Sequence, residues 1–418
     1  MAFTAIRGFN DILPKETANW QRVEEVARRI LADFGFSEIR TPILERSELF
    51  SRSIGITSDI VEKEMYTFSD RGGGLLTLRP EATASIVRAY LEHKLFATDE
   101  VAKLYLIGPM FRYERPQRGR YRQFYQIDAE VLGVADPMVD AEVLKLLAVL
   151  MEELGISGTT LQINSLGCHV CRPVYRERLK ELFRPRLNTL CPDCQRRFEV
   201  NPLRIMDCKV EEVGLLDAAP APIDHLCDEC REHLAKVREY LKVLEVPYEI
   251  NRRIVRGLDY YTRTTFELIS DRLGAQNAVA AGGRYDLLIK ELGGPDLPGL
   301  GFAIGMERLI SLMPHKEIDR GLIFIAPLGE EARKEGLKLA TLLSRAGLPC
   351  QMGYGEKSLK SQMRRAQKLG CPWVLILGEG ELARGGVTLR DMEGHRQEVV
   401  NMSEVIERLR RLRGGEDR

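Results

Sequence analysis

The chain has 418 residues, enough for about two to three domains with hydrophobic cores of their own. Its 61 basic and 61 acidic side chains cancel, which excludes a protein that coats nucleic acid non-specifically but allows a local basic surface. No apolar run reaches the length of a transmembrane helix, and the opening "MAFTAIRGFNDILPKE" has no hydrophobic signal core. We therefore expect a cytoplasmic protein with no membrane segment.

The N-terminal stretch predicts one helix followed by one strand. Apolar residues at helical spacing predict a helix over 18–34, which Gly35 ends. "FSEIRTPILE" at 36–45 then predicts a strand, in which Pro42 is tolerated only at an edge or a break.

Two strand-like runs follow, "KLYLIGPMFRYE" and "QFYQIDAEVLGV", separated by the polar segment "RPQRGRYR". This arrangement predicts a long antiparallel hairpin with an arginine-rich tip. Behind the hairpin, Pro137 stands at the first helical position after Asp136, which predicts a helix to about Leu154.

The composition changes between Gly167 and about Val246. Seven of the nine cysteines fall here, as "CHVC", "CPDC", a lone Cys208 and "CDEC". An odd number of cysteines in a chain of this length fits reduced thiols or metal ligands better than a disulfide framework. The CxxC pairs have the spacing of structural zinc sites, with reduced structural thiols as the alternative. The candidate zinc ligands are Cys168, Cys171, Cys191 and Cys194.

Two further blocks complete the chain. The strand-rich segment 247–314, together with 1–166, predicts an α+β core in which helices flank an antiparallel sheet, with 167–246 as a separate insertion. The segment 313–321 is a plausible linker. The final stretch, 321–418, alternates strand and helix patterns, which predicts a small α/β domain with a largely parallel sheet.

The short run "RGLDYYT", 256–262, fits neither strand alternation nor a helical stripe. One interpretation is a pocket for a small polar molecule, because an arginine and two tyrosine hydroxyls are delivered side by side. The alternative is a strand that buries Leu258 and Tyr260.

The hairpin tip "FRYERPQRGRYRQF" has five arginines, at 112, 115, 118, 120 and 122, against a single acid, Glu114. Guanidinium groups suit phosphate oxygens, and Phe124 could stack on a base, so the hairpin could grip a nucleotide. The alternative is a solvated charged loop. The glycine-rich segments "AAGGRYD" and "GLGFAIGMERL" match no standard nucleotide fingerprint and are weak evidence alone.

Taken together, five segments resemble a known family. "FSEIRTPILE", "FRYE…RQF" and "GLGFAIGMERL" resemble motifs 1, 2 and 3 of the class II aminoacyl-tRNA synthetases. "LTLRPEATASIVRA" and "RGLDYYT" resemble the histidine-binding elements of the histidyl-tRNA synthetase family. The resemblance implies a class II catalytic domain over 1–166 and 247–314, an insertion domain over 167–246, and a C-terminal anticodon-binding domain over 321–418.

The resemblance also implies the reaction. Histidine and ATP, the latter with Mg²⁺, would form histidyl-adenylate and pyrophosphate, and histidine would then pass to the 3′ end of tRNA(His). Because the substrate carboxylate attacks phosphorus in line, positioning and charge stabilisation would dominate. The ATP-binding residues would be Arg112, Glu114, Phe124 and Arg308. The catalytic cations would be Arg112, Arg256 and Arg308. The histidine-binding residues would be Glu81, Thr83, Gln126, Glu130, Tyr260 and Tyr261.

Two further expectations concern partners. Motif 1, around Pro42, implies a homodimer, because this motif forms the subunit interface in the class. In the tail, a predicted helix has a basic face free of acids, which we expect to contact tRNA, although a solvated surface helix is the common explanation for such runs. The basic residues are Lys357, Lys360, Arg364, Arg365 and Lys368. The family's pattern has glycine where Ala82 stands in "RPEAT".

Two other functions compete with this interpretation. A synthetase-like regulatory subunit of ATP phosphoribosyltransferase would usually lack the "RGLDYY" and "RPE-T" residues and the anticodon-binding tail, all of which are present here. A pure RNA-binding module would not need the triphosphate grip of Arg112, Glu114 and Arg308. We therefore expect an active synthetase.

Overall fold

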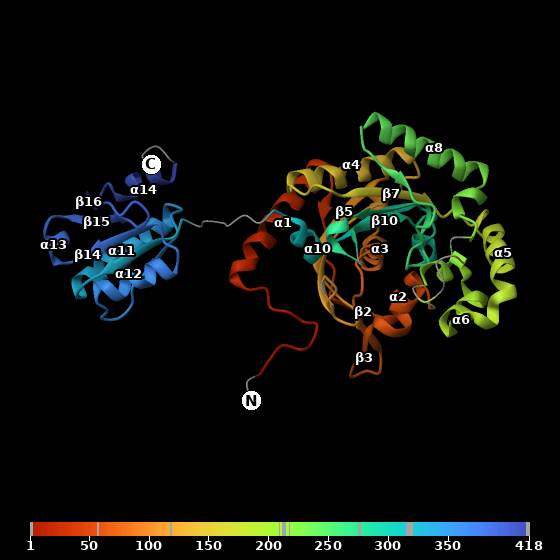
Figure 1. Cartoon of the computed structure of the whole chain (residues 1–418), viewed down its shortest axis with the longest axis horizontal. Coiled ribbons are helices and arrows are strands. Elements are labelled where there is room, and N and C mark those ends of the chain that lie inside the picture. Colours follow the sequence, from red (N-terminus) through yellow and green to blue (C-terminus); the bar gives the residue numbers. More distant parts are fainter. Residues whose placement is uncertain are drawn as a thin grey trace. The chain divides into compact units, whose positions relative to one another are not determined.

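The computed structural model describes residues 3–56, 58–117, 119–208, 210, 215–216, 218–274, 277–314 and 321–414. Arg118 of the predicted hairpin tip and most of the predicted linker, 315–320, lie outside these residues. The chain divides into two units, Met1–Pro314 and His315–Arg418 (Figure 1).

An eight-stranded sheet forms the centre of the first unit (Figure 1). Its strands in spatial order are β1 (Ser37–Glu38), β5 (Ala102–Phe111), β6 (Gln123–Leu132), β11 (Gly299–Gly305), β10 (Ala278–Arg284), β9 (Thr262–Ile269), β7 (Thr160–Ser165) and β8 (Glu249–Ile250). Neighbours from β5 to β7 are antiparallel, and only the short edge strands β1 and β8 pair in parallel. The predicted antiparallel sheet is confirmed.

The predicted hairpin is the pair β5–β6, which stays in register over ten residue pairs from Ala102 with Leu132 to Phe111 with Gln123. The ladder continues one step further, because the Arg112 N–H donates to the Arg122 carbonyl at 2.9 Å. The arginine-rich segment therefore connects two strand ends that are firmly hydrogen-bonded to each other.

Helices α1 (Pro14–Asp33), α4 (Pro137–Glu153), α8 (Asp228–Val243) and α10 (Met306–Leu312) pack with the sheet around one hydrophobic core, to which Leu31, Leu147, Val237 and Phe302 belong. Helix α4 starts as predicted, because the Asp136 carboxylate accepts from the Met138 N–H at 2.8 Å. Helix α1 starts four residues earlier than predicted. Pro14 fits its first turn, and the Glu16 carboxylate accepts from the Leu13 N–H at 3.1 Å.

A small antiparallel sheet lies apart from the large one, in the order β2 (Leu44–Arg46), β4 (Leu75–Leu78), β3 (Tyr66–Ser69). The strand predicted over 36–45 is therefore wrong as one element, because its two ends belong to different sheets. Pro42 lies between them and has no N–H for a ladder. Helices α2 (Ser47–Ile54), α3 (Thr83–Glu92) and α9 (Leu288–Glu291) complete this part of the unit.

The cysteine-rich stretch contains α5 (Arg172–Phe183) and α6 (Pro192–Val200), which share a small core of their own with Tyr175, Phe183 and Phe198. Helix α8, at the end of the same stretch, packs instead into the main core through Leu234, Val237 and Leu241. Among the described residues of the unit, shorter helical turns lie at Ile60–Glu64, Leu95–Ala97, Arg184–Thr189, Pro202–Asp207, Pro222–His225 and Asp271–Leu273.

The second unit is built on a five-stranded sheet, in the order β13 (Cys350–Met352), β12 (Ile323–Pro327), β14 (Trp373–Leu377), β15 (Gly386–Asp391), β16 (Gln397–Asn401). The first three strands are parallel, as predicted, but the last two run antiparallel. The connection over 378–385 is too short for a parallel crossover, which needs about a dozen residues. The helices are α11 (Glu330–Arg345), α12 (Leu359–Lys368), α13 (Glu379–Ala383) and α14 (Val405–Gly414).

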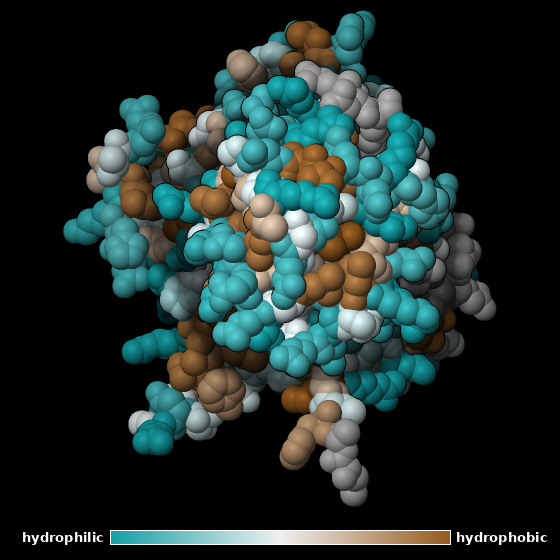
Figure 2. Space-filling model, turned by 90° about the vertical axis from the view of Figure 1, so that its left-hand side faces the viewer, coloured by the Kyte–Doolittle hydropathy of each residue, from teal (hydrophilic) through white to brown (hydrophobic). Residues whose placement is uncertain are grey.

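Among the described residues, no helix is both long and apolar enough to cross a membrane. On the face shown in Figure 2, hydrophilic residues surround small groups of hydrophobic ones.

Candidate active site

A cavity of about 300 Å³ opens on the large sheet, where β6, β10 and β11 meet the hairpin tip and the 256–261 segment. Ten of the eleven residues predicted for ATP, histidine or catalysis line it: Glu81, Thr83, Arg112, Glu114, Phe124, Gln126, Arg256, Tyr260, Tyr261 and Arg308. The eleventh, Glu130, lies behind the wall and accepts a hydrogen bond from the cavity residue Thr83 at 2.6 Å. Segments far apart in the sequence therefore converge on one site.

Residues 256–261 of the run "RGLDYYT" form a loop, and Thr262 begins β9, so the strand alternative is wrong for Leu258 and Tyr260. Tyr260 and Tyr261 are both buried, with ring centroids 4.7 Å apart, and Tyr285 packs edge-on against Tyr260 at 5.6 Å. Arg256 donates to Glu267 at 2.6 Å and lies 5.2 Å from the Tyr261 ring. The loop forms one wall of the cavity.

The cysteine-rich stretch holds this loop through two side chains. Asn201 donates through Nδ2 to the Asp259 carboxylate at 2.9 Å, and Arg204 donates through Nη2 to the Gly257 carbonyl at 2.6 Å. These two contacts fix the loop at Gly257 and Asp259.

Three buried carboxyls, Glu81, Asp128 and Glu130, form what we call the acid group. The Glu81 carboxylate accepts from the backbone N–H groups of Thr83 and Ala84, at 2.9 and 3.0 Å, and so caps the start of α3. Burial raises the pKa of Glu81 and raises that of Glu130 to about 8. At neutral pH Glu130 is therefore protonated in the free protein.

The sequence analysis did not predict Asp128 and Tyr285 as residues of the site. Burial, followed by the nearby charges of Glu130 and Glu81, raises the pKa of Asp128 well above its ordinary value. Its position two residues before Glu130 on β6 places both side chains on one face of the strand, and that spacing could have revealed it. The Tyr285 hydroxyl hydrogen-bonds Glu130, and this tyrosine belongs to the segment "AAGGRYD".

Two small residues shape this end of the cavity. Gly301 on β11 faces Glu130, and a β-carbon added there would come within 1.5 Å of its Oε2 atom. Ala82 has φ −99°, an ordinary right-handed conformation, so alanine fits where the family's pattern has glycine.

Arg112, Arg120 and Arg308 form what we call the arginine group, and all three line the cavity. Burial, together with the charges of Arg120 and Arg112, lowers the pKa of Arg308. Three guanidinium groups that disfavour one another in a partly buried cavity need an anion to offset the repulsion. Backbone carbonyls hold the group in place, since Arg308 donates to Gly119 at 3.0 Å and to Ala278 at 2.8 Å, and Arg112 donates to Pro80 at 2.9 Å.

Glu114 and Phe124 stand next to the arginine group. Glu114 is buried and forms an ion pair with Arg120, and Arg112 lies 5.3 Å from the Phe124 ring centroid. Glu307 accepts from the Tyr125 N–H at 3.0 Å, and burial raises its pKa to about 7. These contacts join the hairpin to the start of α10.

Some buried polar atoms of the cavity have no hydrogen-bond partner within the described part of the chain. They include Oε1 of Gln126, Oδ2 of Asp128 and Nε of Arg256. Because buried polar atoms are normally satisfied, these atoms point to a polar ligand.

The basic residues predicted in the tail, from Lys357 to Lys368, are all exposed on or just before α12. Arg365 lies 6.0 Å from the ring of the exposed Tyr354. None of the five takes part in an ion pair with another described residue.

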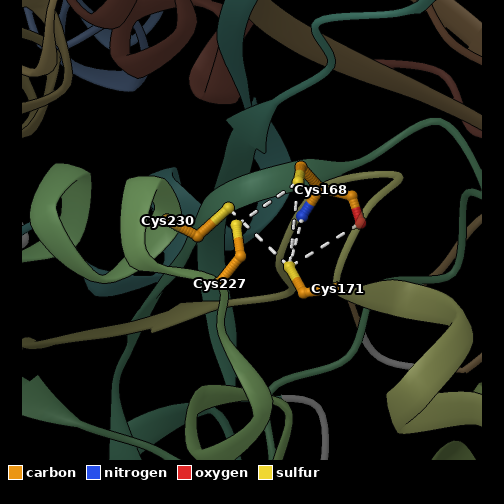
Figure 3. Close-up of side chains that lie close together, drawn as sticks. All are labelled: Cys168, Cys171, Cys227 and Cys230. Carbon is orange, nitrogen blue, oxygen red and sulfur yellow. Dashed lines mark hydrogen bonds between the residues drawn. The ribbon is translucent and has the colours of Figure 1, made fainter.

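The cysteines do not form the set predicted. Cys168 and Cys171 lie beside Cys227 and Cys230 (Figure 3), whereas Cys191 and Cys194 gather with Cys208. The first and second CxxC pairs therefore belong to different clusters. The fold brings the start of the cysteine-rich stretch to its end, a contact that spacing along the chain does not reveal.

Comparison with known proteins identifies the family of the chain. A family model described as histidyl-tRNA synthetase matches residues 8–173 and 204–309, and an anticodon-binding domain model matches 322–412. The histidine–tRNA ligases of Geobacter metallireducens and Syntrophotalea carbinolica are 57% and 53% identical to this chain. The alignments cover 95% and 98% of this chain, and 97% and 98% of those relatives.

Solved structures show the same relationship. The apo histidyl-tRNA synthetase of S. aureus is 34% identical, with a TM-score of 0.83 over 98% of this chain and 100% of its own. A Bacillus halodurans structure titled as an ATP phosphoribosyltransferase regulatory subunit/histidyl-tRNA synthetase is 21% identical, with a TM-score of 0.65, and shares the fold alone. With its class II α+β core and its C-terminal anticodon-binding domain, the chain belongs to the histidyl-tRNA synthetase family.

Proposed function

We propose that this chain activates histidine with ATP, giving histidyl-adenylate and pyrophosphate, and then transfers histidine to the 3′ end of tRNA(His). The observation that carries the proposal is the meeting of the acid group and the arginine group in one cavity. A cationic amino group and an imidazole suit the first group, and a triphosphate suits the second.

Histidine binding rests on the acid group and the tyrosines. Glu81 and Thr83 receive the α-amino group, with the free oxygen of Gln126 close to the amino acid. Glu130 and Tyr261 bind the two nitrogens of the imidazole, and Tyr260 closes the wall. Because Glu130 is already held by Thr83 and Tyr285, its carboxyl is oriented before histidine arrives.

Adenylate formation rests on the arginines. One oxygen of the histidine carboxylate attacks the α-phosphorus in line, and the bond from that phosphorus to the pyrophosphate oxygen breaks. Burial raises the pKa of Glu81 and of Asp128, and the positive charge of Arg112 acts against that rise. Arg112 is therefore close to the acid group as well as to Arg308, a position that suits the α-phosphate. Arg308 takes the γ-phosphate, and Arg256 stabilises the charge that grows in the transition state.

Glu114 and Phe124 bind the adenine. Mg²⁺ would be bound mainly by ATP itself and would neutralise part of the triphosphate charge. The deciding experiment is histidine-dependent exchange of labelled pyrophosphate into ATP. A regulatory subunit or a pure RNA-binding module would show no exchange above background.

Transfer to tRNA and assembly complete the proposal. The exposed basic residues of α12 bind tRNA phosphates in the cytoplasm. The chain works as a homodimer through the β2–β4–β3 sheet, where Leu44, Phe68 and Leu75 are 38%, 47% and 58% exposed. Apolar side chains so exposed on a small sheet favour burial against a second copy. A monomer by light scattering at micromolar concentration, with full activity, would contradict the dimer.

A further inference from the structure

Cys168, Cys171, Cys227 and Cys230 bring their sulfur atoms together, all within 4.8 Å of one another (Figure 3). The Sγ···Sγ distances are 3.7 Å for Cys168–Cys227 and 3.8 Å for both Cys168–Cys171 and Cys171–Cys230. A disulfide needs about 2.05 Å, so these thiols are not bonded to one another. A tetrahedral Zn²⁺ with bonds of about 2.3 Å sets its sulfur ligands about 3.8 Å apart. The observed Sγ···Sγ distances match this separation.

The backbone around the cluster is shaped for sulfur. The Cys168 N–H donates to the Cys171 sulfur at 3.0 Å, and the Val170 N–H donates to the Cys168 sulfur at 3.4 Å. Gly167 has φ +70°, and a β-carbon there would come within 2.4 Å of the Cys171 sulfur. Such N–H···S bonds stabilise thiolates, the form that binds metal.

Each CxxC pair also lies at the start of a helix. Cys171 precedes α5, Cys227 precedes α8, and Cys230 is in the first turn of α8. The positive end of each helix favours negative charge on these sulfurs. Three of the four cysteines are buried in the main core, where single thiolates without a metal would be costly.

We propose that these four cysteines bind one Zn²⁺. The ion would join the start of the cysteine-rich stretch to its end and hold both next to β9, the strand that follows the 256–261 loop. The four sulfur atoms lie at the separations expected around one tetrahedrally coordinated ion, and a set of four thiolate ligands suits zinc. The residues involved differ from the candidate set drawn from spacing alone.

The cluster connects directly to the pocket. Leu166, two residues before Cys168, packs in one hydrophobic cluster with Tyr260 and Tyr261. The Leu166 N–H donates to the Arg263 carbonyl at 2.8 Å, and the Arg263 N–H donates to the Gly167 carbonyl at 2.9 Å. The segment next to the ion is therefore hydrogen-bonded to the start of β9, directly after the two tyrosines of the pocket wall. The insertion whose ends it closes also carries Asn201 and Arg204, which hold Asp259 and Gly257. The four cysteines thus act as positioning residues for histidine binding.

The first test is zinc content. Untagged protein from zinc-supplemented cells is compared with the variants C168S/C227S and C350S/C371S by elemental analysis. We expect the first variant to carry one zinc per chain fewer than the wild type and to melt at a lower temperature. The second variant changes two cysteines of the C-terminal unit and should keep the wild-type zinc content. Equal zinc content in all three proteins, or iron in place of zinc, would overturn the proposal.

A second measurement covers the case in which C168S/C227S fails to fold. The variant C191S/C194S, which leaves the four-cysteine cluster intact, is stripped with a chelator and titrated with Co²⁺. One equivalent should produce the visible absorption of tetrahedral thiolate-bound cobalt, and Zn²⁺ should abolish it. Absence of that spectrum would contradict a four-thiolate site.

The positioning role rests on the proposed function and has its own measurement. Zinc-stripped protein should show a several-fold higher KM for histidine, a smaller change for ATP, and recovery when zinc is restored. Equal changes for both substrates would refute positioning, although the zinc count would stand. Normal zinc content with no pyrophosphate exchange would overturn the proposed function and leave the metal site intact.

Discussion

The acid group and the arginine group share one cavity but are held in opposite ways. Glu81, Thr83 and Glu130 satisfy one another and the backbone, so this end is ordered before any ligand binds. The side chains of the arginine group repel one another, and they are held by backbone carbonyl groups and by the ion pair of Arg120 with Glu114. The difference teaches that the acid group is organised to select a substrate before binding. The arginine group, in contrast, gains its main stabilisation when a negatively charged phosphate group binds.

The largest effect should come from the arginine group. Arg112→Ala removes the cation placed next to the α-phosphate, and we expect kcat for adenylate formation to fall about 10²- to 10³-fold. Because the change also relieves repulsion, the melting temperature should not drop. Arg115→Ala, an exposed arginine of the same hairpin tip, is the control and should keep near-normal exchange. A loss confined to KM would show that Arg112 binds but does not stabilise the transition state.

The acid group should respond differently. Glu130→Gln and Tyr261→Phe each leave an imidazole nitrogen without its partner in a buried site, which costs about 1–3 kcal/mol. We expect KM for histidine to rise about 5- to 150-fold, with far less change for ATP, in steady-state exchange kinetics. Equal changes for the two substrates would remove the assignment of these residues to histidine.

The pH dependence of stability offers a third test. Burial raises the pKa of Glu130 from its ordinary value of 4.5 to about 8, so between these values the folded protein keeps a proton that the unfolded chain releases. This group therefore lowers the free energy of unfolding as pH rises from about 4.5 to 8. Compared with the wild type, the Glu130→Gln variant should therefore gain more free energy of unfolding at pH 8 than at pH 5, by on the order of 1–3 kcal/mol. Parallel denaturation profiles for wild type and variant would contradict a protonated Glu130.

The smallest effect should come from the tail, which contributes no residue assigned to the cavity. A Lys360→Ala/Arg364→Ala/Lys368→Ala variant should exchange pyrophosphate normally but bind tRNA more weakly. Each lost phosphate contact should flatten the log–log salt dependence by about one unit. An unchanged slope would mean that the basic face of α12 is only solvated.

The sequence was sufficient where a pattern is local or where a family motif covers it. Ten predicted residues line the cavity, and the β5–β6 hairpin has the predicted pairing. Prediction from the sequence failed where contacts depend on the completed fold. Nothing in the spacing pairs Cys168 with Cys227, because their meeting depends on how α5 and α8 return to β7. Nor does the run 36–45 reveal that its ends join different sheets. Asp128 lay within reach, since strand periodicity alone places it beside Glu130.

Gly301 illustrates how far the choice of substrate depends on residues outside the reaction. The Glu130 carboxyl occupies the space that a side chain on the neighbouring strand would fill. Even a methyl group at position 301 would push that carboxyl toward the substrate and shorten the pocket from behind. If Glu130 binds histidine as proposed, the absence of a side chain at position 301 of β11 helps to set the size of amino acid that the site accepts, and a mutation there would change selectivity without removing any group that touches histidine.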